Sequence, residues 1–444
     1  MRAGDIAPPA VVPHPLPPDS PMAAWPAQLR IAIEMLPQAA YVWDDADPTV
    51  LWDDPDPDRL VWDAPFIGSG FTDVICDLHA LETVAGEPDE LGVFGPGTTI
   101  LTLANPDGRY SAWTADGRLV YFAPGRRMCL FADIAGEPWW IASLRIDRWS
   151  PQADGTVLVE ASDGFSLLAR ERGTYTPGTA GQTPLARIQA IAAVASFPDT
   201  VRGDPGDVTL TRQATDRSPL EEIQIVALSD AGIVAVDADG ALTYRNRLWP
   251  AGRDDQAGEL VVFTDNVCTV DHVVWDLELA AADDALANDI RLTNVAGLVA
   301  TATDTSAMFG LVYPLTHPDP DQWTTQAEGN AVAAALHAQR STPRAAIAEF
   351  TLNLHDPRQD LWRAGIDLRL GDRIRFISEQ AEPAGGTDIL DLVAIVSTIR
   401  HQILPDQWTV TVGTTRTVDY VAIERWDETR FVWDDPDPLA VWRY

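Results

Sequence analysis

The sequence contains no lysine, so all 31 of its basic residues are arginine, and they face 66 aspartates and glutamates. A formal net charge of −35 leaves no surplus of cations that could neutralise a nucleic-acid backbone. An acidic wall repels passing DNA instead and keeps it from sticking. The composition therefore argues against a protein that wraps nucleic acid, and it permits one past which DNA moves. The lack of lysine itself is typical of a GC-rich genome.

Cysteine is scarce, and long apolar runs are missing. Cys76, Cys129 and Cys268 are odd in number and form no C-x-x-C pair, so we expect small core residues rather than a disulfide framework or a zinc site. No run of about 18 apolar residues is present, which predicts no membrane insertion. The first residues lack the apolar centre of a signal peptide, so none is expected.

Motifs for catalysis and cofactor binding are also missing. None of the seven histidines forms H-E-x-x-H, and no nucleophile elbow, phosphate loop or dinucleotide glycine pattern occurs. We therefore predict no catalytic residue, no cofactor and no metal, and hence no enzyme. Paired carboxylates are abundant, however, which keeps a cell-wall hydrolase among the alternatives.

Two acidic stretches could be calcium-binding loops. They are Asp53–Arg59 and Asp237–Gly240. Such a loop needs glycine at its sixth position and glutamate at its twelfth. Counting from Asp237, the twelfth residue is Leu248, and counting from Asp53, the sixth is Asp58. Both stretches are therefore predicted to be turns.

Sixteen tryptophans are present, and several recur in one phrase near both ends of the chain. "YVWDDADPTVLWDDPDPDRLVWDAP" spans 41–65, and "FVWDDPDPLAVWRY" spans 431–444. Strand-like triplets that end in tryptophan alternate with acidic proline turns. Such small meanders are only marginally stable in water unless they pack on each other or on a neighbouring subunit. We predict protein-docking surfaces, with intramolecular packing and sugar binding as alternatives. The tryptophans concerned are Trp43, Trp52, Trp62, Trp433 and Trp442.

The chain divides by composition into six segments. Two of them carry short, regularly spaced strands with Gly, Pro and Asp turns, which favours barrels or sandwiches. The expected segments are a proline-rich arm (1–40), a Trp-Asp meander (41–65), a first β domain (66–174), an α/β insert (175–250), a second β domain (251–420) and a C-terminal Trp-Asp segment (421–444).

The insert has the clearest local signals. A helix is expected over 183–198 and another after Ser218, which can cap it, with Glu221 completing a capping box and Gly232 at its C-terminal position. A hairpin should follow, turning at Asp239-Gly240. An alanine-rich helix is expected at about 325–339, within the second β domain.

Three stretches resemble one family. The first is "GTTILTLANPDGRYSAW" with the 123–170 stretch, the second is "LEEIQIVALSDAGIVAVDADGALTYRNR", and the third is "LRLGDRIRFI" with "IVSTIRHQILPDQWTVTVGTT". Their order resembles that in baseplate hub (tail-associated, Tal-like) minor tail proteins of siphophages that infect actinobacteria. The resemblance covers roughly residues 70 to 415. It implies a mainly β fold with two tube-like β-barrel hub domains flanking a helix-plus-hairpin module.

The resemblance also implies a role. Such a protein is a structural part of the virion tail tip: a homotrimer whose ring meets the distal tail protein or the tail tube. Its lumen holds the C-terminus of the tape measure protein and later lets DNA pass without specific binding, and other minor tail or fibre proteins attach to it. The alternative is a receptor- or glycan-binding tail-tip protein that uses its Trp-Asp surfaces, and the third reading is the cell-wall hydrolase.

Overall fold

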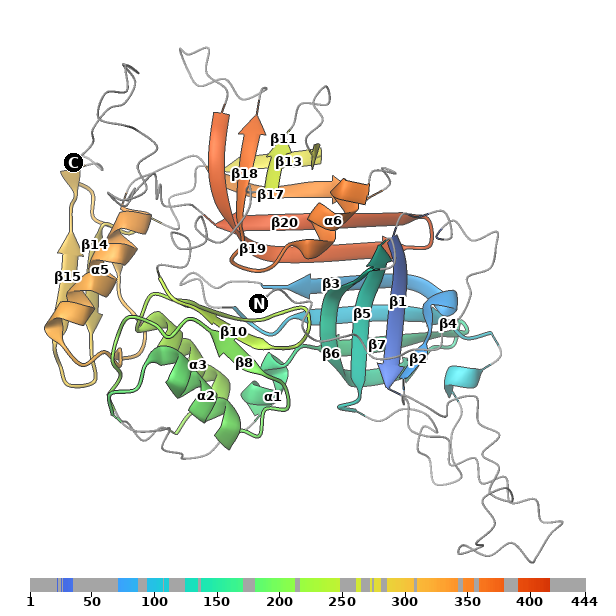
Figure 1. The fold of residues 1–444 in the computed structure, drawn as a ribbon, viewed down its shortest axis with the longest axis horizontal. Coiled ribbons are helices and arrows are strands. Elements are labelled where there is room, and N and C mark those ends of the chain that lie inside the picture. The colour runs from blue at the N-terminus through green and yellow to red at the C-terminus, as the bar shows by residue number, and fades with distance from the viewer. Residues whose placement is uncertain are drawn as a thin grey trace, which may run out of the picture.

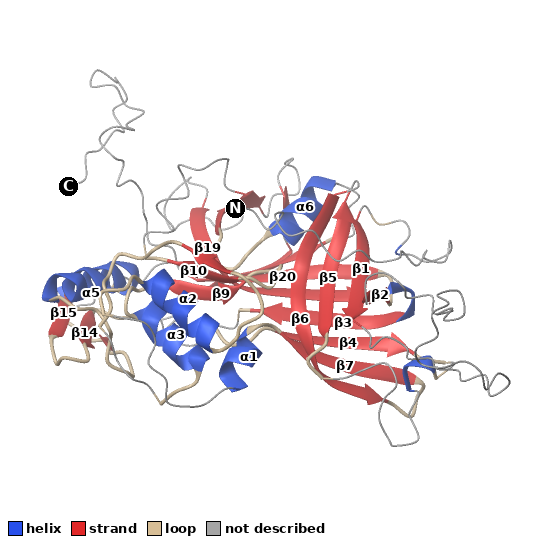
Figure 2. Cartoon of the chain, turned by 60° about the horizontal axis from the view of Figure 1, so that its bottom comes forward, coloured by secondary structure: helices blue, strands red, loops and turns tan. Residues whose placement is uncertain are grey.

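The structure is a computed structural model. It describes Met22, Trp25 and residues 27–34, 71–86, 94–106, 108–111, 124–134, 137–170, 180–211, 216–247, 261–264, 272–273, 275–280, 286–306, 310–341, 346–354, 359–378 and 390–415. The chain is mainly β, with most of its helices at one side and one helix, α6, by the second β region (Figures 1 and 2). No helix among these residues is long and apolar enough to cross a membrane.

The first β region is an antiparallel array in the order β3-β4-β7-β6-β5-β1-β2. In β7 every second residue, Val157, Val159 and Ala161, is buried, which is the pattern of a strand with one face on a core. The strands are β1 (Ala27–Glu34), β2 (Phe71–Asp73), β3 (Leu78–Ala85), β4 (Thr98–Ala104), β5 (Arg127–Ile134), β6 (Glu137–Pro151) and β7 (Thr156–Ser162).

The second β region continues the same sheet. Long β19 pairs with β18 and β3 along its length and with β20, and β20 leads on to β17 and β13. Its elements are β11 (Val261–Thr264), β12 (His272–Val273), β13 (Trp275–Ala280), β17 (Ala346–Asn353), α6 (Gln359–Asp367), β18 (Arg373–Ser378), β19 (Leu390–Leu404) and β20 (Gln407–Thr415).

The expectation of two separate barrels is therefore not confirmed. The described strands form one 14-stranded sheet with open ends at β12, β13 and β2, because β19 hydrogen-bonds β3 as well as its own hairpin partner. The prediction of a mainly β fold with an α/β insert is confirmed at that level.

The helical module lies beside this sheet. Its strands β8, β10 and β9 form a second sheet, and helices α2 and α3 contact each other and cover it. The elements are α1 (Phe165–Arg170), α2 (Pro184–Val194), β8 (Val201–Gly203), α3 (Pro219–Leu228), β9 (Ile233–Val236) and β10 (Leu242–Arg245). The expected hairpin is confirmed, with Gly240 in the left-handed region at φ 92°.

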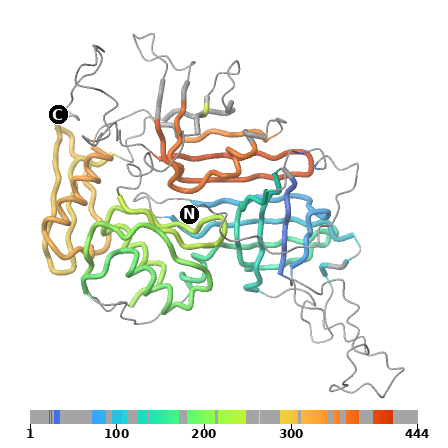
Figure 3. Tube along the Cα trace, in the orientation of Figure 1, coloured from blue at the N-terminus to red at the C-terminus, as the bar shows by residue number. Residues whose placement is uncertain are grey.

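A third sheet lies next to the helical module (Figure 3). It has the order β15-β14-β16 and is covered on one face by α5. The elements are β14 (Asp289–Thr293), β15 (Val299–Thr303), β16 (Pro314–Leu315) and α5 (Gln326–Arg340). Helix α5 confirms the helix expected at about 325–339, and its Thr325 cap forms a capping box with Glu328 that was not predicted.

Helix α3 begins as the sequence predicts, but the residue in the left-handed conformation at its end is not the predicted one. Ser218 and Glu221 form the predicted capping box, and Pro219 is the first helical residue. At the other end the residue in the left-handed conformation is Ala231, at φ 48°, not Gly232. Gly232 instead donates its N–H to the Ala227 carbonyl at 2.9 Å, so it occupies the second position of a Schellman ending.

The sequence-based prediction missed β1, which lies inside the segment expected to be a proline-rich arm. Leu29, Ile31 and Ile33 are buried between β2 and β5. Just before β1, the Trp25 ring lies 5.8 Å from the rings of both Trp362 and Trp408. The N-terminal segment therefore packs on the second β region as well as the first.

Candidate functional site: the junction of the three modules

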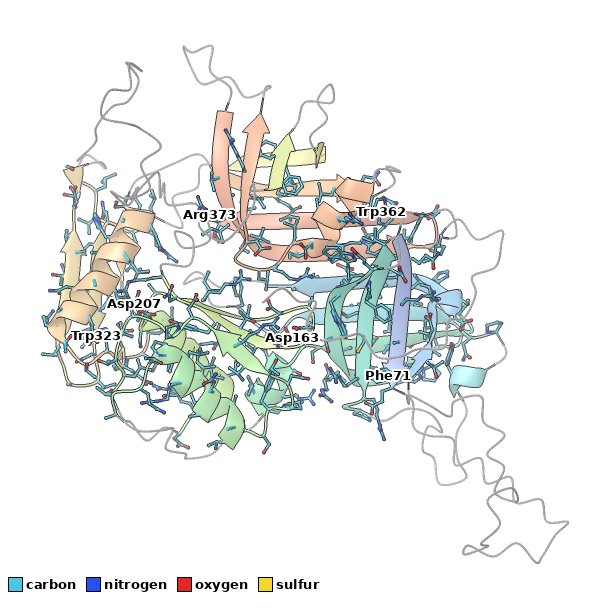
Figure 4. All side chains as sticks on the ribbon, in the orientation of Figure 1. Phe71, Asp163, Asp207, Trp323, Trp362 and Arg373 are labelled. Atoms are coloured by element: carbon cyan, nitrogen blue, oxygen red, sulfur yellow. The ribbon has the colours of Figure 1, made fainter. Side chains whose placement is uncertain are left out.

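The five tryptophans predicted to dock other proteins, Trp43, Trp52, Trp62, Trp433 and Trp442, all lie outside the described residues. What the structure does place is the junction where the two β regions and the helical module meet. Figure 4 shows Asp163 at the side of this junction where the helical module meets the first β region. The sequence-based prediction assigned no docking or catalytic role to the junction's residues, and it interpreted Asp237–Gly240 as a turn.

The centre of the junction is the ladder between β3 and β19. Residues 81–85 pair with 399–403, and the Thr398 hydroxyl donates to the Gly86 carbonyl at 2.6 Å. Gly86 has φ 74°, and a Cβ there would lie 2.5 Å from the Ser397 carbonyl oxygen. Glycine is therefore required where the two β regions approach each other.

Two arginines fasten the neighbouring segments to this ladder. Arg245, at the end of β10, donates to the Leu370 carbonyl and lies 3.5 Å from an Asp372 carboxylate oxygen. Arg369 donates to the Trp140 carbonyl in β6 at 3.2 Å. The loop after α6 is thus bound to both the helical module and the first β region.

A small cavity of about 50 Å³ lies at the same place. Its lining comes from β3, β6, the β9–β10 turn, residues 368–370 and β19. A cavity of that size admits a few water molecules at most and not an organic ligand.

Two titratable groups that line this cavity have shifted pKa values. Burial raises the pKa of Asp163 to about 7, although its carboxylate accepts N–H bonds from Gly97 at 2.8 Å and from Phe165 at 2.9 Å. Burial, with Arg369 nearby, lowers the pKa of His401 to about 3. The Trp408 indole N–H donates to His401 Nδ1 at 3.3 Å, which requires a neutral ring.

The acidic turn Asp237–Gly240, considered above for calcium, is occupied by an arginine. Arg202 donates to Asp237 at 2.8 Å and to Asp239 at 2.9 Å. Burial opposes ionisation of Asp237, but Arg245 and Arg202 outweigh it and hold its pKa below the usual value. The turn that the sequence predicts is confirmed, and its carboxylates are ion-paired within the chain.

A second polar network joins the helical module to the third sheet. Arg187, which is fully buried in α2, donates to Gln182 at 2.8 Å, to Gln322 at 3.2 Å and to the Thr211 carbonyl at 2.8 Å. Gln322 in turn donates to the buried Glu222 of α3 at 2.6 Å. These bonds lock the segment before α5 onto helices α2 and α3.

Within the described residues, no group of three or more His, Cys, Asp or Glu side chains is placed to hold a metal ion. Buried polar groups bind across module boundaries at two places, where Arg245 pairs with Asp372 and where Gln322 donates to Glu222. This arrangement holds the two β regions and the helical module in one fixed relation. Breaking a buried polar network leaves unpaired groups, which costs much free energy.

Several solved structures of tail proteins are similar to this chain. A tail protein from Neisseria meningitidis MC58 has 11% sequence identity and a TM-score of 0.52, over 76% of this chain and 92% of that one. A 43 kDa tail protein of prophage MuSo2 from Shewanella oneidensis has 17% identity and a TM-score of 0.48, over 78% and 95%. The prophage tail protein gp18 from Listeria monocytogenes has 11% identity and a TM-score of 0.43, over 76% and 89%.

The chain has the fold of a tail protein. The fold assignment rests on the Neisseria structure, whose TM-score is above 0.5 and which this chain covers almost completely. No protein-family model matches the sequence, and no curated protein matches it. The coarse part of the resemblance found in the sequence, a tail-protein fold, thereby agrees with the structure.

Proposed function

We propose that this protein is a structural baseplate hub protein of a long, non-contractile phage tail. The observation that carries the proposal is the fold shared with the Neisseria tail protein over 92% of that chain. The fixed joint between the modules supports it, because a part that connects a tube to a tail tip must hold its shape under load.

In this proposal the chain forms a homotrimer at the tail tip, in which the two β regions of each copy's continuous sheet contribute to a ring that meets the distal tail protein or the tail tube. The tape measure C-terminus ends in the lumen, and DNA passes later. The net charge of −35 suits such a lumen, since an acidic wall does not retain DNA. A net positive lumen wall in the assembled ring would contradict this part of the proposal.

The tryptophan phrases fit this role as docking surfaces for adjacent tail or fibre proteins. The test replaces Trp433 and Trp442 with alanine in the virus and counts assembled tails by electron microscopy. We expect assembled tails to fall at least tenfold. Normal tails that no longer adsorb to cells would favour the receptor- or glycan-binding alternative instead.

The location in the particle is tested with antibodies against the chain. Purified particles should be labelled at the tail tip and not on the capsid. In parallel, the purified protein is applied to a cell-wall zymogram, where a structural hub protein gives no clearing. Clearing that survives further purification would favour the cell-wall hydrolase.

A further inference from the structure

The stretch that runs from the end of β14 through β15 to β16 has almost no charge in a chain that is otherwise rich in it. Residues 292–316 contain one charged side chain, Asp304, although 22% of the whole sequence is charged. Four of the six large hydrophobic side chains that are exposed among the described residues also belong here. They are Leu298, Val299, Leu311 and Val312.

Strand β15 is an open edge of this sheet. It pairs with β14, and no other described strand pairs with it. Figure 1 shows it at the outer end of the molecule, with α5 over one face of its sheet. An exposed edge strand is normally protected by charge, proline or a bulge, but β15 reads VATAT and has none of these.

The ladder shows which backbone groups of β15 point outward. Asn294 donates to the Leu298 carbonyl at 3.0 Å and Asp304 donates to the Asn288 carbonyl at 3.1 Å, one pair beyond each end of the ladder. Because hydrogen-bonded pairs alternate in antiparallel strands, Val299, Thr301 and Thr303 direct their N–H and C=O groups away from β14. The Val299 carbonyl is covered by the Gln326 amide at 2.9 Å. The open hydrogen-bonding positions are therefore centred on Thr301.

The side chains of these same residues form the uncovered face. Along β15, Val299, Thr301 and Thr303 are exposed, whereas Ala300 is fully buried against α5. In β14 the exposed residue opposite Thr301 is Arg291, and it is paired with Asp289 at 3.0 Å. Strand β15 itself thus carries no charge and has an open edge, and the one exposed cation beside it, Arg291, is already paired within the chain.

We propose that the open edge and uncovered face of β15, with Val299, Thr301 and Thr303, are where one copy of the chain contacts a second copy. The charge argues for that occupant. Two copies that each carry −35 repel one another, and juxtaposed like charges cost several kcal/mol, so copies associate best through a strand that brings no excess negative charge into the contact. The proposal rests on the ring of copies in the proposed function and names the surface that builds it.

The test measures the mass of the full chain by light scattering over a concentration series. Val299→Glu places a negative charge on the proposed contact, and its matched control is Val194→Glu, an exposed valine at the end of α2. A second variant, Thr301→Pro, removes an outward N–H without removing a bond to β14. Circular dichroism and thermal unfolding establish that all three are folded.

The expected result is that the wild type and Val194→Glu form the same oligomer. Val299→Glu and Thr301→Pro should dissociate at protein concentrations at least tenfold higher than the wild type. Oligomers of unchanged stability in both β15 variants would overturn the contact and leave the ring itself standing. Equal weakening by the two glutamates would also overturn it, because general repulsion would then be the cause.

A wild type that stays monomeric at every concentration would overturn the contact and the ring together. The tail-tip location is judged separately by the antibody labelling. The failure of the contact surface and the failure of the proposed function can therefore be told apart.

Discussion

At the scale of single residues, the ends of α2 and α3 show how this chain tolerates backbone strain. Ser196 and Ala231 have φ values of 52° and 48°, and both precede the residue that closes a Schellman ending. A side chain in this region costs about 1 kcal/mol relative to glycine. The glycine at 232 serves close packing instead, because a Cβ there would lie 2.7 Å from the Arg245 carbonyl oxygen.

Ala231→Gly should therefore stabilise the protein. We expect the free energy of unfolding to rise by about 0.5 to 1 kcal/mol, since relief of strain exceeds the extra entropy of glycine in the unfolded chain. Urea unfolding followed by circular dichroism measures it. Gly232→Ala is the neighbouring control and should destabilise. A loss of stability in Ala231→Gly would contradict the assignment of the left-handed residue.

His401 gives a pH dependence whose sign follows from its pKa. The folded pKa, about 3, lies below the unfolded value of 6.5, so the unfolded state binds the extra proton between these values. Stability that is present above pH 6.5 is therefore lost as the pH falls towards 3. In His401→Asn an acceptor for the Trp408 indole is kept and the titration is removed.

We expect the urea midpoint of the wild type to fall more between pH 7 and pH 5 than that of His401→Asn. Asp163 changes in the opposite direction throughout this range, because its pKa, raised to about 7, makes the folded state bind the proton more tightly. Comparing the two proteins at each pH cancels that contribution. Identical pH slopes would show that His401 is not held neutral by the fold.

At the scale of elements, local signals could be read from the sequence and distant pairings could not. The Ser218–Glu221 capping box and the hairpin turn at Asp239-Gly240 depend on residues within a few positions, and both were predicted correctly. The bond from Thr398 to Gly86 joins residues 312 positions apart, and no sequence pattern announces it. The alternation of Leu29, Ile31 and Ile33 in β1 was present, but the surrounding prolines favoured an extended arm.

The Arg187 network also joins residues that are far apart in the sequence, so the sequence did not predict it. It binds the segment before α5 to α2 and α3. Arg187→Met should lower the free energy of unfolding by about 3 kcal/mol, because it leaves the buried Gln322 and the half-buried Gln182 and Thr211 carbonyl with unmade bonds. Urea unfolding provides the measurement.

The matched control is Arg148→Met. Arg148 makes an exposed ion pair with Glu160 at 3.3 Å, and surface pairs contribute about 0 to 1 kcal/mol. We expect its effect to stay within about 0.5 kcal/mol. Equal effects in both variants would mean that the network does not hold the modules together.

At the scale of the whole molecule, the described residues form one continuous large sheet, a helical module bound to that sheet, and a third sheet bound to the helical module. A mainly β architecture with a helical insert could be predicted from strand spacing and helix signals. The fusion of the two β regions could not, since it depends on a ladder between 81–85 and 399–403. The fold shared with the Neisseria tail protein extends over 76% of this chain, so the likeness covers more than one module.

The most direct test of the central claim is a reconstruction of the tail tip in the intact particle. The account predicts three copies of this chain in a ring at the end of the tail tube, with the 14-stranded sheet fitting the density as one rigid unit. Six copies would favour a distal tail protein instead of a hub. Absence of the chain from the tail would contradict the account altogether.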